Sequence, residues 1–337
     1  MILVKKRIIA ATLYYGGFVG LIKTSQKESI IVGYHRILPS NSKERDFIQP
    51  GMYVTLETFE KHISYLSRNY NIISLKDILK EKKAHRACVV TFDDGWADNY
   101  KYAFPVLKRY NIPATIFLAT KKVGTSEWPW TDMISFSIHM AGIDKFIHTM
   151  INGLVNLGIS PPEFVKYLRC REKFTEYVIE YMKNLNPAVL FSLVNYIDSE
   201  MAIYTNLMKG SRPWLTWDEV NEMSQHGIDF GAHSHNHVIL TNIPLPEVRS
   251  ELCLSRDILT RIIKKPIRTF CYPNGRYNNA VVSILKESGY DVAVTTKRGS
   301  IDGSSSTLCL NRIMIHNDMT STIPMFACVL TGKIPYF

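Results

Sequence analysis

The chain has 337 residues and a net charge of +10, with 46% hydrophobic and 21% charged residues. This balance excludes a disordered or fibrous protein, and the length allows one large α/β barrel or two smaller domains. The charge suits an anionic partner, but the basic residues are scattered and no DNA- or RNA-binding motif accompanies them, so we expect no nucleic acid. Six cysteines without C-x-x-C spacing indicate free thiols and favour a cytoplasmic protein.

A short apolar segment opens the chain. Basic residues 5–7 precede an apolar run that reaches Ile22 and contains two adjacent glycines. The run is shorter than the roughly 20 apolar residues that span a bilayer, and it lacks a small-residue cleavage site. We therefore expect an apolar, interfacial helix in residues 1–28, with peripheral membrane contact through residues 5–23. The alternative is an uncleaved signal anchor on a membrane-anchored, exported protein.

From residue 29 onwards, apolar strands alternate with helices. Residues 29–34 and 88–92 are apolar, β-branched runs typical of buried strands. A helix and a further strand at residues 114–119 complete a β-α-β unit, which requires parallel strands. Polar residues repeatedly follow the strand ends. The sequence therefore predicts an α/β fold, a distorted (β/α) barrel over residues 29–337, with the site at the carboxyl ends of its strands.

The alternation is interrupted over about residues 131–211, where apolar residues recur at helical intervals. We expect a helical insertion there. Trp128 and Trp130 stand at its start and are candidates for a wall on which a sugar stacks. In the alternative interpretation, the two rings anchor the insertion to the barrel core.

Two adjacent carboxylates, Asp93 and Asp94, follow the strand at residues 88–92 and precede Gly95. Neighbouring carboxylates repel and raise each other's pKa, so a fold keeps such a pair where a cation or a proton-transfer role compensates it. Adjacent residues of a strand point in different directions, so one carboxylate can bind a metal while the other acts as a base. The alternative is a simple turn, because Asp-Asp-Gly is also common in turns.

Three histidines within five residues follow a short predicted strand at residues 228–232. His233 and His237 are four apart, so on one helical turn they would share a face and bind one metal, whereas His235 would point away. A chance surface cluster is the alternative. Together with Asp94, the pair forms an Asp-His-His set typical of catalytic zinc sites, and cobalt, nickel or iron would also suit these ligands.

These motifs resemble those of the polysaccharide deacetylases of carbohydrate esterase family 4, over roughly residues 29–316. Thr-Phe-Asp-Asp-Gly at residues 91–95 is similar to the first family motif, and His-Ser-His-Asn-His at residues 233–237 is similar to the second. The resemblance implies a metal-dependent hydrolase that removes N-acetyl groups from N-acetylhexosamine units of a glycan. It implies that Asp93 is the base and that Asp94 and the two histidines bind a divalent metal, zinc in the first place.

The third family motif departs from the pattern, because Cys271 stands where the family often has an arginine that steadies the base. Arg312 is our candidate replacement, with Arg268 as the second choice. The Tyr-Pro-x-Gly sequence that follows is similar to that of the subgroup acting on poly-N-acetylglucosamine, which implies that the Tyr272 amide holds the oxyanion. Two further residues of this loop are candidates for substrate binding: Pro273 and Gly275.

The general acid has two candidates. The usual family histidine follows a C-terminal strand and resembles His316, whereas the poly-N-acetylglucosamine subgroup takes its acid from a Tyr-His pair near the N-terminal strand, which is His35 here. We favour His35, because an ordinary histidine pKa suits protonation of a departing amine. Two other functions stay open: hydrolysis of another acyl bond on a sugar, such as an O-acetyl ester or a formamide, and glycan binding without catalysis.

Overall fold

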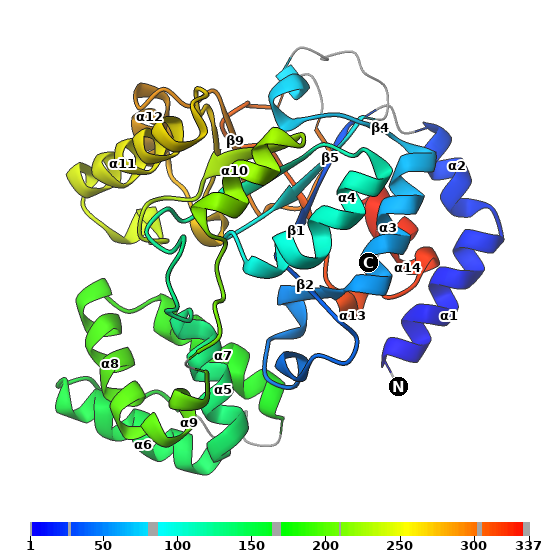
Figure 1. Ribbon diagram of the computed structural model, residues 1–337. Helices are drawn as coiled ribbons and strands as arrows, with labels where there is room; N and C mark the ends of the chain where they lie inside the picture. Colours follow the sequence, from blue (N-terminus) through cyan, green and yellow to red (C-terminus); the bar gives the residue numbers. More distant parts are fainter. Residues whose placement is uncertain are drawn as a thin grey trace. The chain divides into compact units, whose positions relative to one another are not determined.

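The structure is a computed structural model, and it describes residues 2–25, 28–79, 87–163, 170–208, 210–301 and 305–332. The chain divides into two compact units, coloured along the sequence in Figure 1. Unit 1 comprises residues 1–40, 50–125 and 214–337, and unit 2 comprises residues 41–49 and 126–213. All six cysteines are free thiols, as their spacing predicts.

Unit 1 is built on a sheet that, within the described residues, has eight parallel strands. The order is β10-β1-β5-β6-β7-β8-β9, and β4 pairs with β5 beside this path. The strands are β1 Ile30–Tyr34, β4 Asn71–Ile72, β5 Ala87–Phe92, β6 Ala114–Leu118, β7 Ile228–Ala232, β8 Thr269–Cys271, β9 Val292–Val294 and β10 Ile313–Met314. Just before β10, Leu310 forms a parallel bridge to Val294 of β9, so the two ends of the strand order are joined. The expected distorted (β/α) barrel is confirmed.

Helices cover the outside of this sheet (Figure 1). They are α3 Leu56–Asn69, α4 Phe104–Tyr110, α10 Trp217–Gln225, α11 Leu245–Ile263, α12 Asn279–Glu287, α13 Asn317–Thr320 and α14 Ile323–Thr331. Each of the longer helices turns an apolar stripe to the core; α3, for example, buries Phe59, Ile63 and Leu66 at helical spacing. This helix begins at an N-cap, because the Thr55 side chain accepts a hydrogen bond from the Thr58 amide. A small second sheet pairs β2 Arg36–Leu38 with β3 Tyr53–Thr55.

The N-terminal segment forms two helices rather than the single one expected. Helix α1 is Ile2–Tyr15 and α2 is Phe18–Ser25. They are separated at Gly16 and Gly17, where Gly17 has a φ of 83°, a value that glycine adopts without strain. Both helices contact α14 at the end of the chain. Among the described helices, none has both the length and the apolar character needed to cross a membrane.

Unit 2 is helical, as the periodicity of this region predicts. Its main helices are α5 Trp130–Ala141, α6 Ile143–Asn156, α7 Arg171–Lys183, α8 Pro187–Glu200 and α9 Ala202–Thr205. They bury an apolar core of their own, which includes Phe146, Phe174 and Leu193. Unit 2 also takes in residues 41–49.

Candidate active site

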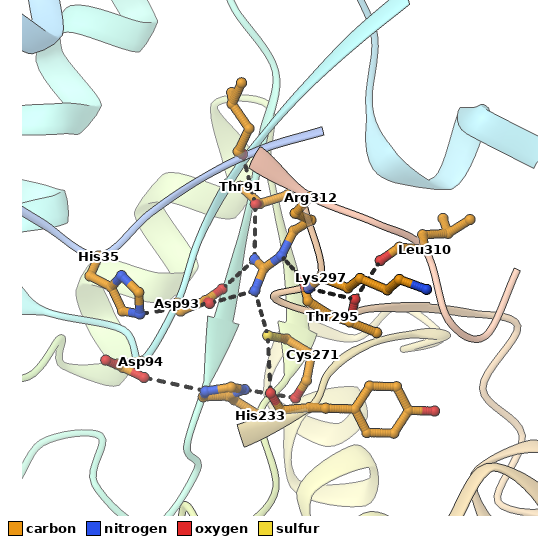
Figure 2. A network of polar contacts seen from close by, with 12 residues as sticks. His35, Thr91, Asp93, Asp94, His233, Cys271, Thr295, Lys297, Leu310 and Arg312 are labelled. Atoms are coloured by element: carbon orange, nitrogen blue, oxygen red, sulfur yellow. Dashed lines mark hydrogen bonds and ion pairs between the residues drawn. The ribbon is translucent and has the colours of Figure 1, made fainter. Parts of the chain in front are cut away.

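The predicted site residues follow strand ends at one edge of the sheet. Tyr34, the last residue of β1, pairs in register with the last residue of β5. The Asp93 amide continues this register by donating to the Tyr34 carbonyl at 2.9 Å. Beyond β6, the His233 amide donates in the same way to the Leu118 carbonyl at 2.9 Å. Because parallel strands end at a common edge, the aspartates, His35 and His233 converge there (Figure 2).

Asp93 is held by a fully buried arginine. Both terminal guanidinium nitrogens of Arg312 donate to Asp93, Nη1 to Oδ1 and Nη2 to Oδ2, each at 2.7 Å. Burial of Asp93 by itself would raise its pKa, but the charge and hydrogen bonds of Arg312 outweigh this effect and hold the Asp93 pKa below its ordinary value. The carboxylate therefore stays ionised although it is buried.

The remaining donors of Arg312 are also used (Figure 2). Its Nε donates to the Thr295 carbonyl at 2.8 Å, and Nη1 donates to Thr91 Oγ1 at 3.2 Å. Nη2 lies 3.2 Å from the Cys271 sulfur, so the guanidinium reaches the position where the related motif has its own arginine. The second candidate, Arg268, pairs instead with Asp291 on the exposed surface.

His35 faces the other side of Asp93. Its Nε2 lies 3.9 Å from Asp93 Oδ2, and its side chain is 19% exposed. Burial lowers the His35 pKa, although the nearby charges of Asp94 and Asp93 oppose this effect. His316, the other candidate acid, contacts the Asp318 carboxylate at the start of α13.

A buried network fixes the backbone around His35. Asn99 Nδ2 donates to the His35 carbonyl at 2.9 Å. Asp98 accepts from Arg36 Nε at 2.8 Å and from the Ile37 amide at 2.9 Å, so one carboxylate holds the two residues that follow His35. Sequence reasoning missed this network, although Asp98 and Asn99 lie only a few residues after the Asp-Asp motif.

Asp94 and the two predicted histidine ligands form a second cluster. His237 Nε2 lies 3.0 Å and His233 Nε2 lies 3.3 Å from Asp94 Oδ1. Trp96 Nε1 donates to the other oxygen of Asp94 at 3.0 Å. Burial opposes ionisation of Asp94, but hydrogen bonds from His233 and His237 hold its pKa well below the ordinary value. Asp94 itself adopts a φ of 74°, a backbone conformation that is uncommon outside glycine.

The donor set of this cluster fits a divalent metal ion. The three ligand atoms all lie within 4.8 Å of one another. His233 Nδ1 lies 2.7 Å from the Cys271 carbonyl, an oxygen that can only accept, so Nδ1 carries a proton. In the neutral imidazole that a metal requires, Nε2 would then present its lone pair to the ion in place of its contact with Asp94. Two imidazoles and one carboxylate leave room for water, as catalytic metal sites require.

The segment that carries His233 and His237 is a loop, so the expected helical turn is wrong. Ser234 and His237 have φ values of 59° and 61°, in the left-handed region, which no α-helix contains. Glu251 of α11 holds this loop: its Oε2 accepts from the amides of His235 and Asn236, both at 2.8 Å. No local sequence signal marked Glu251 for this contact.

His235, which we expect to play no part in metal binding, contacts a different side chain, and its having no metal role stays a prediction. Its Nδ1 lies 2.8 Å from Thr120 Oγ1, and it is not part of the cluster formed by Asp94 and the other two histidines.

The oxyanion role expected of the Tyr272 amide stays a prediction, and the structure shows this amide in a hydrogen bond. This N–H donates to the Val294 carbonyl at 3.2 Å and is used within the barrel. The Tyr272 hydroxyl is buried and donates to the Leu308 carbonyl at 2.9 Å. Pro273 and Gly275 form a tight turn after it, and a side chain at Gly275 would meet Thr296 Oγ1 at 2.0 Å. Their part in substrate binding stays a prediction.

The two tryptophans proposed as a sugar wall lie in unit 2. Trp128 Nε1 donates to the Met208 carbonyl at 3.0 Å, and Trp130 is half-buried against the core of unit 2. Both rings therefore have structural contacts within their own unit, and their role toward substrate also stays a prediction.

Comparisons with known proteins agree on one family. The family model for polysaccharide deacetylases matches residues 80–151 and 165–293. The YxkH protein of Bacillus subtilis (strain 168) is 23% identical over 308 residues, which cover 89% of this chain and 76% of that protein. A poly-β-1,6-N-acetyl-D-glucosamine N-deacetylase of Staphylococcus aureus is 30% identical over 131 residues, 34% of this chain and 43% of that enzyme.

Solved structures share the fold at lower identity. The deacetylase PplD of Streptococcus pyogenes, solved with acetate, superimposes with a TM-score of 0.58 at 20% identity and covers 91% of this chain and 99% of its own. IcaB of Ammonifex degensii gives a TM-score of 0.54 at 16% identity, over 89% of this chain and 97% of its own. The chain therefore belongs to the polysaccharide deacetylase family and is an enzyme that removes acetyl groups.

Proposed function

We propose that this deacetylase hydrolyses the N-acetyl group of N-acetylhexosamine units in a glycan, with a divalent ion, zinc in the first place, held by Asp94, His233 and His237. The observation that carries the proposal is the position of Asp93. An ionised, arginine-bound carboxylate lies 3.9 Å from an imidazole and directly precedes in the chain Asp94, a member of a three-ligand cluster of the composition found in catalytic metal sites. A bound ion would supply Lewis-acid chemistry, lowering the pKa of its water and polarising a carbonyl.

Asp93 is the proposed general base. It accepts a proton from the water that attacks the acetamido carbonyl, while Arg312 holds its orientation by two hydrogen bonds. His35 is the proposed general acid. It donates a proton from Nε2 to the sugar nitrogen as the carbon–nitrogen bond breaks, so that acetate and a free amine leave.

The distance between His35 and Asp93 supports this division of roles. His35 Nε2 is 3.9 Å from Asp93 Oδ2, too far for a strong hydrogen bond but close enough for both groups to act on the same amide of a bound substrate. Asn99 and Asp98 maintain this spacing through the backbone before and after His35. The substrate class is supported by the name of the Staphylococcus aureus relative, a poly-β-1,6-N-acetyl-D-glucosamine N-deacetylase.

Acetate release by the purified protein tests the proposal. N-acetylglucosamine oligomers with β-1,6 and with β-1,4 linkages are compared with an O-acetylated xylan, before and after chelation and after zinc, cobalt or nickel is restored. We expect acetate from the amide substrates alone, lost on chelation and recovered with metal. Release from xylan but from neither oligomer would assign an esterase, and release unaffected by complete metal removal would contradict the metal role.

A further inference from the structure

We propose that the outer face of α1 and α2 docks on an anionic lipid bilayer. Seven large apolar side chains of these helices are between 39% and 79% exposed: Leu3, Val4, Ile8, Ile9, Tyr15, Phe18 and Leu21. Only eight other exposed large apolar side chains occur in the whole remainder of the described chain. So many exposed large apolar side chains on two short helices indicate an interaction surface, because exposed apolar residues elsewhere on a soluble protein usually occur singly.

The opposite face of the two helices attaches them to unit 1. Ala10 and Val19 are buried in the barrel unit's core, at 0% and 2% exposure. Arg7 Nη2 donates to Ser321 Oγ at 3.3 Å, which ties the first helix to the segment between α13 and α14. Figure 1 shows α1 and α2 lying along the outside of unit 1, beside α14. The helices are thus held on one side, and their apolar side faces solvent.

Charge identifies the occupant of this face. Residues 1–27 contain five basic residues and no acidic residue. Lys5 is exposed and sits between exposed apolar neighbours in the sequence, Val4 before it and Ile8 one turn later. Apolar side chains interleaved with cations suit a lipid interface, because the apolar groups enter the acyl boundary while the cations contact anionic headgroups. The paired glycines between the helices let the second helix follow the surface at its own angle.

Vesicle sedimentation with the full chain tests this docking. Vesicles of phosphatidylglycerol and phosphatidylcholine are compared with vesicles of phosphatidylcholine alone, and we expect at least about tenfold tighter binding to the anionic vesicles. The double variant Ile8→Asp with Phe18→Asp should lose this binding by at least about tenfold, because each change places a charge in the apolar face. The matched control is Phe191→Asp, which alters a side chain that is 68% exposed in unit 2 and should leave binding unchanged.

A charge variant tests the electrostatic part separately. Lys5→Gln keeps the apolar face and should weaken binding to anionic vesicles by about fivefold, with no effect on neutral vesicles. Melting temperatures of all variants, and their acetate release from soluble oligomers, should match the wild type, since the face lies outside the site. These readouts separate a failure of docking from a failure of the proposed activity.

Three outcomes would overturn the proposal. The first is equal binding of the wild type to neutral and anionic vesicles, or no binding to either. The second is wild-type binding by the double variant. The third is a dimer of the wild type, seen by analytical ultracentrifugation without vesicles, that the double variant converts to monomer, since the face would then be covered by a second copy of the chain.

Discussion

Asp93 and Asp94 are neighbours in sequence, yet they lie on two differently built sides of the site. On the arginine side, Asp93 and Arg312 are almost completely buried, with 3% and 0% side-chain exposure. On the histidine side, Asp94 contacts a loop that reaches the surface, where the His237 side chain is 41% exposed. One side is a closed ion pair inside the barrel, and the other is a cluster with one of its three ligands, His237, at the surface. Two identical carboxylates thus have different partners, an arginine for Asp93 and histidines for Asp94, and different chemical roles follow from this.

The largest effect is expected from variants of the two aspartates, which should differ in whether they lose catalysis or the metal ion. Asp93→Asn removes the proposed proton acceptor, so kcat should fall by about 10³-fold while the protein still binds one metal ion. Asp94→Ala should instead lose the ion. Metal content after dialysis, kcat and the melting temperature are measured together, because either change also alters a buried polar network. An active Asp93→Asn protein or a metal-loaded Asp94→Ala protein would break the comparison.

The arginine side is tested by Arg312→Met. This change leaves Asp93 buried without its counter-charge, and the free energy of unfolding should fall by about 3–5 kcal/mol. The matched control is Arg268→Met, since Arg268 and Asp291 form an exposed pair whose loss should cost about 0–1 kcal/mol. Urea unfolding of both variants measures the difference. Equal losses would mean that Arg312 contributes no more than a surface charge.

The histidine side is tested at Glu251, the residue that holds the histidine loop. Glu251→Gln replaces a carboxylate, both of whose oxygens accept hydrogen bonds from the loop, with a group that has only one acceptor. We expect metal affinity to fall by about 10–100-fold, because the loop that positions the histidines loses part of its anchorage. Glu247→Gln, at an exposed position of the same helix, should leave affinity unchanged. Unchanged metal titration of the Glu251 variant would show that the loop holds its shape unaided.

A buried imidazole outside the site sharpens the contrast. His62 is 0% exposed, stacks on Phe326 at 3.8 Å and lies 2.8 Å from the Thr320 carbonyl through Nε2. Burial lowers its pKa to about 3, although the bond to Thr320 opposes this effect. The unfolded chain, with the ordinary pKa of about 6.5, therefore binds a proton that the folded protein does not bind. The contribution of neutral His62 to the free energy of unfolding is therefore fully present above about pH 6.5 and is lost as the pH falls toward 3.

The His62 contribution can be measured by comparing unfolding at pH 7.5 and pH 5.5. Wild-type protein should lose about 1.4 kcal/mol more stability between these values than His62→Gln, which cannot titrate. Urea unfolding at each pH provides the four free energies required. Equal losses in the two proteins would mean that His62 is protonated in the folded state as well.

Features carried by short stretches of sequence could be predicted. The apolar run of β5 and the two carboxylates after it identify a strand end. The composition of the Asp-His-His set also follows from the sequence. These features depend on residues that are close together in the sequence, so a short stretch of sequence is enough to predict them.

Features that join distant segments could not be predicted in the same way. The helical turn expected at His233 is wrong because Ser234 and His237 adopt the left-handed backbone conformation. Neither position is a glycine, the residue from which this conformation is usually predicted. The Tyr272 amide is occupied by a strand that follows about 20 residues later, and Glu251 reaches the histidine loop from a helix. Such contacts depend on strand pairing and helix placement, which local propensity does not specify.

The pairing of β1 with β10 also has a consequence for the order in which the protein is made. Val32 pairs with Ile313, so the last strand of the barrel is inserted beside the first one. As the chain leaves the ribosome, Asp93 emerges 219 residues before Arg312, so their ion pair cannot form until Arg312 has been made. The acid–base half of the site is therefore completed only after nearly all of the strands that surround it have emerged.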